Sequence, residues 1–185
     1  MTKRITEEEC EALYQKYETP PHVIRHCRAV SRVACEIGRQ LNLCGRNLDL
    51  NLIKVAGLAH DVARVSPNHG EVGGDILESL GYMDEAAIVR VHMHYSLNDF
   101  AHLNETDLVC LGDRLVIEDR YAGLDKRFDY IINKAPKDSG IRQHLIEIRE
   151  INRGLIGQIE EAIGQTLDSL FTEDKKQERQ KNESE

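Results

Sequence analysis

Apolar residues recur at intervals of three and four along most of the 185 residues, and this spacing limits the fold more than any other feature. One stripe between residues 22 and 41 consists of Val23, Val30, Val33, Ala34, Ile37 and Leu41. Residues at these intervals share one face of an α-helix, and no segment shows the clear alternation of a half-buried strand. The sequence therefore predicts an all-α fold, a bundle of about six to eight helices.

Residues that begin and end helices divide the first part of the chain. Thr6 opens a capping-box pattern, which predicts a short first helix. Pro20-Pro21 ends that helix and introduces the next, over residues 22–41. Asp49 can cap a third helix that runs to about Val65.

The same signals predict the remaining helices. Asn68 can cap a fourth helix that ends at Gly81, and residues 98–104 are expected to form a loop. Further helices are predicted over residues 84–92, 105–119, 128–133 and 140–172. The last of them carries an apolar stripe that packs on the body of the protein or on a partner chain, so a homo-oligomer formed through it is one expectation.

The chain shows no internal repeat and no second domain in its pattern. We predict one domain over residues 1–172, with its core over 21–119 and the C-terminal helix over 140–172. Residues 173–185 are polar throughout and are predicted to be disordered.

Charge and cysteine content restrict the possible partners. Asp and Glu total 32 against 24 Lys and Arg, a net charge of −8, so the chain lacks the broad basic surface of nucleic-acid binders. Five cysteines without a C-x-x-C pattern indicate neither a disulfide framework nor a thiolate metal site. No signal peptide and no apolar run of roughly 20 residues is present. We expect a cytoplasmic protein that binds neither nucleic-acid polymers nor membranes.

Four ionisable residues interrupt the predicted apolar faces: His26, His60, Asp61 and Asp113. His26 lies on the stripe of its helix, His60 and Asp61 continue the stripe of the third, and Asp113 follows the run Leu-Val-Cys-Leu-Gly. A buried carboxylate without a partner is costly, so a cation must meet it.

A divalent metal ion explains all four residues together. Each alone has an ordinary structural explanation: a core histidine bonded to a carbonyl group, an aspartate paired with an arginine, or a chance His-Asp dipeptide. Nitrogen and oxygen ligands without thiolate suit Fe, Mn, Co, Ni, Zn or Mg. A water bound to such an ion becomes a nucleophile near neutral pH.

At these positions the chain resembles the HD-domain metal-dependent phosphohydrolases. The resemblance rests on HVIRHCRAVSRVACEIG with His26, AGLAHDVAR with His60 and Asp61, and CLGDRLV with Asp113, and it covers about residues 21–119. It implies an HD-domain-like helical bundle, metal binding by these four residues and hydrolysis of phosphate esters, often of nucleotides. One departure is Gly112, where alanine commonly precedes the aspartate.

Further histidines are candidates for a second metal site. His69, His92 and His94 lie in segments that resemble those completing a two-metal site in some HD subfamilies, and the alternative is that they are surface or capping residues. His92 and His94 face opposite sides of a helix, so one at most is a ligand unless the helix ends there. Arg64 is a candidate for phosphate binding or, alternatively, a solvated helix end, and Asp61 is a candidate for orienting the attacking water.

These observations predict a metal-dependent phosphohydrolase with one or two metal ions per chain. Its expected substrate is a phosphomonoester or phosphodiester, a nucleotide or a related small phosphate compound. The alternatives are a di-iron HD-type oxygenase and a non-catalytic helical sensor or interaction module with a structural metal. The segment from Asp119 to Tyr130, rich in Arg and Tyr, is expected to border the pocket, with no assigned role.

Overall fold

A computed structural model of the chain describes residues 3–136 and 140–172, so the tail predicted to be disordered over 173–185 lies outside the described residues. The chain forms two compact units, residues 1–122 and 123–185. The described residues form eight long α-helices, a further helical segment over residues 167–172, a short 3-10 helix and one two-stranded hairpin, which confirms the all-α prediction. The prediction that one domain spans residues 1–172 stays a prediction. No helix in the described ranges combines the length and apolar character needed to cross a membrane.

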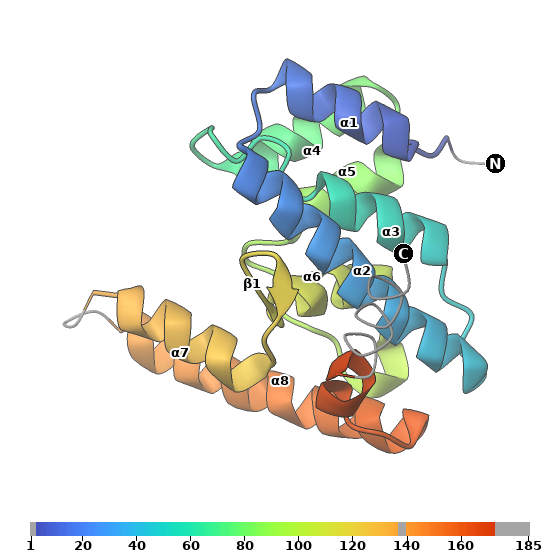
Figure 1. Cartoon of the computed structure of the whole chain (residues 1–185), viewed down its shortest axis with the longest axis vertical. Coiled ribbons are helices and arrows are strands. Elements are labelled where there is room, and N and C mark those ends of the chain that lie inside the picture. Colours follow the sequence, from blue (N-terminus) through green and yellow to red (C-terminus); the bar gives the residue numbers. More distant parts are fainter. Residues whose placement is uncertain (1–2, 137–139, 173–185) are drawn as a thin grey trace, which may run out of the picture. The chain divides into compact units, whose positions relative to one another are not determined.

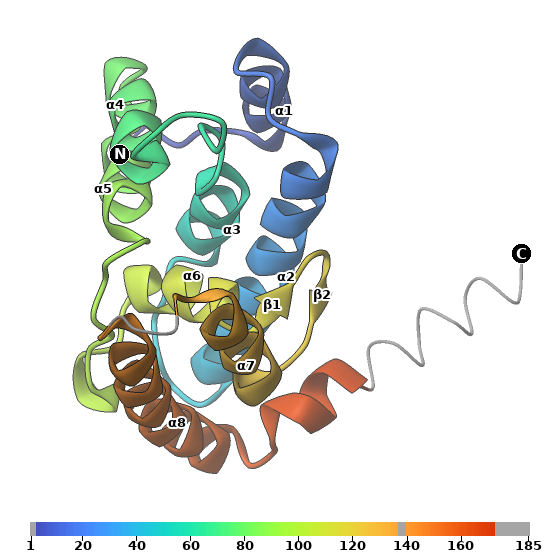
Figure 2. The same cartoon turned by 90° about the vertical axis from the view of Figure 1, so that its left-hand side faces the viewer.

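The first unit is built around one central helix (Figure 1). Its elements are α1 (Glu7–Lys16), α2 (Pro21–Leu43), α3 (Leu50–Ala59), α4 (His69–Ser79), α5 (Met83–Val91), η1 (Phe100–His102), α6 (Glu105–Asp113), β1 (Val116–Ile117) and β2 (Arg120–Tyr121). Helix α3 contacts α1, α2, α5 and α6, and Figure 2 shows it between α2 and α5. Every residue from Val55 to Ala59 is buried, as expected for a helix packed on all sides.

The predicted starts of the first three helices are confirmed. Thr6 Oγ1 accepts a hydrogen bond from Glu9 N at 3.2 Å, and the Glu9 carboxylate accepts from Thr6 N at 2.8 Å, which completes the capping box. Pro21 is the first residue of α2, where a missing N–H costs nothing. Asp49 Oδ1 accepts from the backbone N–H groups of residues 51 and 52 and caps α3.

Two predicted features of the α3–α4 region are wrong. Helix α3 ends at Ala59 rather than near Val65, because residues 60–65 form successive turns in which the N–H groups of Val62 and Arg64 donate to carbonyl oxygens three residues earlier. Asn68 precedes α4 but makes no side-chain cap, since its backbone is left-handed with φ +54°. Asparagine tolerates this conformation better than most residues.

Two later helix boundaries also differ from the prediction. Helix α6 ends at Asp113 instead of Asp119, because residues 116–121 form an antiparallel hairpin in which Val116 pairs with Tyr121. Strands of two residues are too short to leave an alternating pattern in the sequence. Helix α7 (Leu124–Lys134) is longer than the predicted 128–133.

The second unit is a pair of helices followed by a turn and a short helical segment. Helices α7 and α8 (Ile141–Ile163) are joined by an ion pair between Arg149 and Asp129 at 3.1 Å. Gly164, with φ +73°, ends α8, so the stripe predicted as one helix to residue 172 is divided, and residues 167–172 form a separate helical segment. Ile141 and Ile151 are exposed on α8, and the homo-oligomer expected through this helix stays a prediction.

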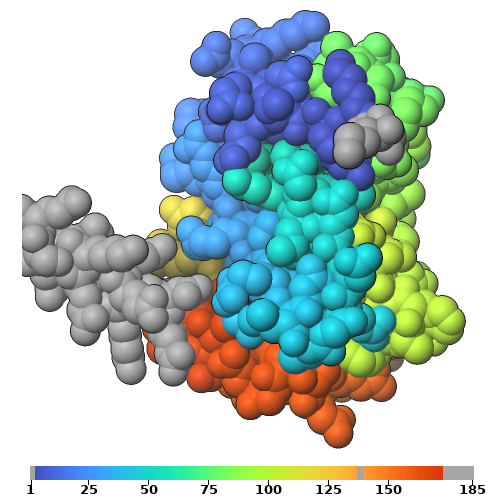
Figure 3. Space-filling model, turned by 90° about the vertical axis from the view of Figure 1, so that its right-hand side faces the viewer, coloured from blue at the N-terminus to red at the C-terminus, as the bar shows by residue number. Residues whose placement is uncertain are grey.

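The segment before α1 joins the starts of α3 and α5. Arg4 donates to Asp49 at 3.0 Å and to Asp84 at 2.5 Å, and the fully buried Glu85 accepts from Ile5 N at 3.3 Å. Figure 3 shows this N-terminal region (dark blue) lying against α3 (cyan) and the α5 region (green). The contacts therefore tie together two helices whose C-terminal ends carry His60 and His92.

Gly57 controls how closely α3 approaches α2. A Cβ atom at residue 57 would lie 2.8 Å from Ser31 Cα, a backbone atom that cannot easily move aside. We expect Gly57→Ala to lower the free energy of unfolding by about 1–3 kcal/mol, the usual cost of overpacking.

Gly154 on α8 is the matched control, because a Cβ atom there meets nothing within 4 Å. Gly154→Ala should raise the free energy of unfolding by about 0.5–1 kcal/mol through helix propensity. Urea denaturation of both variants measures the two effects, and a shift of the same sign in both would contradict the close-approach argument.

Candidate metal centre

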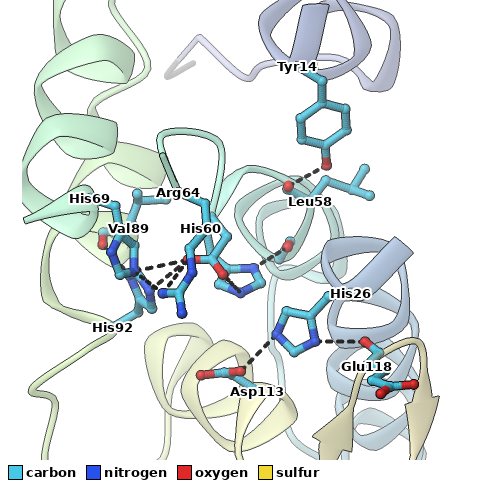
Figure 4. A network of polar contacts seen from close by, with 12 residues as sticks. Tyr14, His26, Leu58, His60, Arg64, His69, Val89, His92, Asp113 and Glu118 are labelled. Atoms are coloured by element: carbon cyan, nitrogen blue, oxygen red, sulfur yellow. Dashed lines mark hydrogen bonds and ion pairs between the residues drawn. The ribbon is translucent and has the colours of Figure 1, made fainter. Parts of the chain in front are cut away.

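Five segments of the first unit bring six predicted site residues together (Figure 4). His26 lies on α2, His60 and Asp61 directly follow α3, His69 begins α4, His92 directly follows α5, and Asp113 ends α6. Except on α2, each side chain is placed where a helix begins or ends, so the packing of the helices fixes its position.

The six side chains form two clusters that share Asp61. In the first cluster, the ligand atoms of His26, His60 and Asp61 lie within 4.8 Å of one another, and in the second those of Asp61, His69 and His92 do so. Asp113 adjoins the first cluster through a distance of 3.0 Å between its Oδ1 and His26 Nε2.

Each oxygen of Asp61 faces a different cluster. Its Oδ2 lies 3.8 Å from His60 Nε2, whereas its Oδ1 lies 3.1 Å from His69 Nε2 and 3.5 Å from His92 Nε2. This arrangement suits a carboxylate that binds two cations, one through each oxygen.

Backbone carbonyl groups fix the orientation of three imidazole rings. The Nδ1 atoms of His26, His60 and His92 donate to the carbonyl oxygens of Glu118, Gly57 and Val89 at 2.9, 2.8 and 2.7 Å, respectively. A carbonyl oxygen can only accept, so Nδ1 carries the hydrogen, and in the neutral ring Nε2 keeps a free lone pair. All three Nε2 atoms point toward the carboxylates of Asp61 or Asp113.

A ring nitrogen that faces a carboxylate oxygen needs either a proton or a metal cation between the two atoms, and Asp113 and Asp61 raise the pKa of His26 and His92 against the effect of burial. His60 Nε2 and Asp61 Oδ1 are buried, and neither has a hydrogen-bond partner among the described residues. Burying such acceptors is costly unless something positive satisfies them. A divalent metal ion has the required charge, and imidazole nitrogen and carboxylate oxygen are suitable ligands. The residues therefore fit a metal site.

The protonation states of the central pair also suit metal binding. Burial lowers the pKa of His60 to about 4, so its ring is neutral at pH 7. Burial alone would raise the pKa of Asp61, but the neighbouring His60, His69, His92 and Arg64 lower it by more, so the carboxylate is ionised. A neutral imidazole and a carboxylate are the forms that bind metal ions.

The remaining two predicted site residues differ in their placement. Arg64 Nη1 donates to His69 Nε2 at 2.9 Å and lies 3.8 Å from Asp61 Oδ1, with its side chain 45% exposed. His94 is exposed on the turn after α5 and belongs to neither cluster, whereas His92 is buried.

Sequence reasoning missed the groups that support the ligands. The carbonyl groups of Gly57, Val89 and Glu118 leave no signal, because every residue has a carbonyl. Only the structure distinguishes one of these carbonyl groups. Glu118, at the tip of the β1–β2 hairpin, has φ +54°, an uncommon conformation for a residue other than glycine. Arg114 is half-buried and donates to the Tyr95 carbonyl, a contact between α6 and the segment after His92.

Gly112 explains how α6 reaches α2. A Cβ atom at residue 112 would lie 3.1 Å from both Ala34 Cβ and the Val30 carbonyl oxygen. Glycine in place of the alanine that is common at this position therefore accompanies a close approach of α6 to α2. The next residue, Asp113, reaches His26 on α2.

Comparison with known proteins agrees with this geometry. The HD domain matches residues 23–121, more than half of the chain, and contains both clusters. The chain belongs to the HD-domain family.

Two curated relatives match parts of the chain. An uncharacterized protein of Methanocaldococcus jannaschii is 35% identical over 71 residues, 37% of this chain and 42% of that protein. A tRNA (cytidine(56)-2'-O)-methyltransferase of Thermoplasma volcanium is 32% identical over 91 residues, 47% of this chain and 25% of that protein. The chain thus spans less than half the length of either relative, and no solved structure matches it.

His92 and His94 offer a paired test of the second cluster. We expect His92→Ala to lower the amount of Mn²⁺ bound per chain, because the variant removes a buried candidate ligand of that cluster. His94→Ala should bind as much Mn²⁺ as the unmodified protein, since its side chain is exposed. Elemental analysis after equilibrium dialysis measures both, and equal binding by the two variants would argue against His92 as a ligand.

Proposed function

We propose that the chain is a metal-dependent phosphohydrolase of the HD type. Its substrate is a phosphomonoester or phosphodiester in a small molecule, with nucleotides as the leading class. One observation carries the proposal: Asp61 directs one oxygen to each of two imidazole-lined clusters, and the half-exposed Arg64 lies beside it. Family membership supports the same chemistry, since HD domains are usually metal-dependent phosphohydrolases.

The two clusters divide the ligands between two sites. His26, His60, Asp61 and Asp113 would hold one divalent ion, and Asp61, His69 and His92 would hold a second. Bound divalent ions acidify a coordinated water and polarise a phosphoryl oxygen.

The chain's own groups would orient the reactants. Asp61 can accept a hydrogen bond from the attacking water, because its carboxylate is ionised and lies between the clusters. Arg64 can bind a phosphate oxygen and stabilise negative charge in the transition state. The bonds from Nδ1 to backbone carbonyl groups keep the imidazole rings in place during turnover.

The burial of the side chains indicates where a substrate enters. His60 is 1% exposed and lies at the closed end of the site, whereas the side chains of Asp113 and Arg64 are 23% and 45% exposed. A net charge of −8 favours a small anion bound by local cations over a nucleic-acid polymer. We therefore propose a small phosphate compound as the partner of this site.

A panel of phosphate esters tests the activity. Gently purified protein is assayed with nucleotides and with nitrophenyl phosphomonoesters and phosphodiesters, before and after chelation and re-addition of Mn²⁺, Co²⁺, Ni²⁺, Fe²⁺ or Mg²⁺. We expect hydrolysis that chelation removes and one of these ions restores. Turnover that consumes dioxygen would instead indicate an oxygenase, and tight metal binding without turnover would indicate a structural metal.

Asp61→Asn gives a sharper version of the same test. The substitution preserves shape but removes the charge that faces both clusters, so kcat/KM should fall by at least about 100-fold, beyond what loss of a supporting hydrogen bond costs. Asp75→Asn is the control, because Asp75 is 72% exposed and pairs with Arg90 on the surface. Circular dichroism confirms folding of both variants, and equal activity in the two would count against the proposal.

A further inference from the structure

We infer that Arg64 is a built-in competitor for the second metal ion. Its guanidinium group occupies a ligand of the second cluster and must leave that ligand before a divalent ion can use it. The inference rests on the two-cluster part of the proposed function. It adds that Arg64 limits how readily the second cluster binds a metal ion.

His69 Nε2 is the contested atom. A guanidinium group has only N–H donors, so the 2.9 Å bond from Arg64 Nη1 makes His69 Nε2 the acceptor. An imidazole nitrogen has a single lone pair in the ring plane. It can accept a hydrogen bond from Arg64 or bind a metal ion, but it cannot do both.

The same contact explains an otherwise unfavourable distance. His69 Nε2 lies 3.1 Å from Asp61 Oδ1, yet with its lone pair given to Arg64 it has no hydrogen to donate to that oxygen. Arg64 Nη1, 3.8 Å from Asp61 Oδ1, supplies positive charge to both acceptors. The guanidinium group thus partly takes the electrostatic role that a divalent ion would take in the second cluster.

The first cluster does not depend on this contact. His60 faces Asp61 Oδ2, whereas Arg64 and His69 face Oδ1. His26 and Asp113 are paired with each other. Displacement of Arg64 should therefore alter the affinity of the second cluster and leave that of the first nearly unchanged.

Arg64 also has room to move away. It lies in the turns between α3 and α4, and its side chain is 45% exposed. A guanidinium group released from His69 remains near the clusters and is free to bind a phosphate oxygen. Filling of the second cluster and readiness for the substrate are thereby linked through one side chain.

A Mn²⁺ titration of chelator-treated protein tests the inference. The electron paramagnetic resonance signal of free Mn²⁺ gives the number and affinity of the sites in the unmodified protein and in Arg64→Met. We expect two classes of site, with the dissociation constant of the weaker class at least tenfold lower in Arg64→Met and that of the tighter class changed by less than twofold. The control is Arg28→Met, which removes an arginine 54% exposed and paired with Glu11 on the surface.

Arginine side-chain nitrogen NMR with diamagnetic Zn²⁺ provides an independent readout. The Arg64 signals, assigned by their loss in Arg64→Met, should change with the second equivalent of Zn²⁺ and not with the first.

Several results would overturn the inference. In the titration, the affinity of the weaker class of Mn²⁺ sites could be unchanged or lower in Arg64→Met, or could rise equally in Arg28→Met. Every variant could also show a single class of Mn²⁺ sites. In the NMR experiment, the Arg64 signals could stay unchanged when the second equivalent of Zn²⁺ is added. A single class together with phosphate-ester hydrolysis would leave the proposed function standing. Two classes of Mn²⁺ site with the expected affinity change in Arg64→Met, but no hydrolysis of phosphate esters, would support the inference and count against the proposed function.

Discussion

The contact between imidazole lone pairs and the shared carboxylate of Asp61 is the constraint on which the rest of the first unit depends. His60 and Asp61 are buried at the C-terminal end of the central helix, where His60 Nε2 and Asp61 Oδ1 have no hydrogen-bond partner among the described residues. The fold holds this arrangement through close helix approaches at Gly57 and Gly112 and through backbone carbonyl groups that each take one imidazole hydrogen. Helix packing and metal-ligand geometry are thus set by the same residues. The polar groups at the centre oppose folding unless a cation meets them, which is why a site of this kind needs the large apolar core around it.

The sequence predicts the centre of this site well because burial and polarity conflict there. His26 and Asp113 stand out among apolar neighbours at helical spacing, and the His60-Asp61 pair follows a helix whose last five residues are all apolar or glycine. The arrangement around the centre is harder to predict. The supporting carbonyl groups have no side-chain signature, and the β1–β2 hairpin is too short to show alternation, so its six residues resemble a continuation of α6. Arg64 is recognisable as a cation near the site, but its contact with His69 depends on the turns that replace the expected end of α3.

Different pairs of helices hold the two clusters. In the first, the α2–α3 and α2–α6 approaches position the side chains. The second depends on how α4 and α5 are positioned, and the N-terminal segment contributes through Arg4, Asp84 and Glu85. HD-domain membership extends over both clusters. The side chains of His69 and His92 are 12% and 2% exposed, less than those of His26 and Asp113, so packed helices hold both clusters.

The hairpin tip sets a rule for how this region can vary. Glu118 reaches the His26 ring with its carbonyl oxygen, and it does so only because its backbone adopts a left-handed turn between two paired residues on each side. The side chain of Glu118 is exposed and contributes nothing to that bond, so natural variants can carry asparagine or glycine there with less backbone strain. Hairpin length is another matter. One residue more or fewer would turn a different peptide group toward α2 and leave the His26 ring free to rotate. Homologous chains should therefore vary in the residue types of this turn but keep the same number of residues in it.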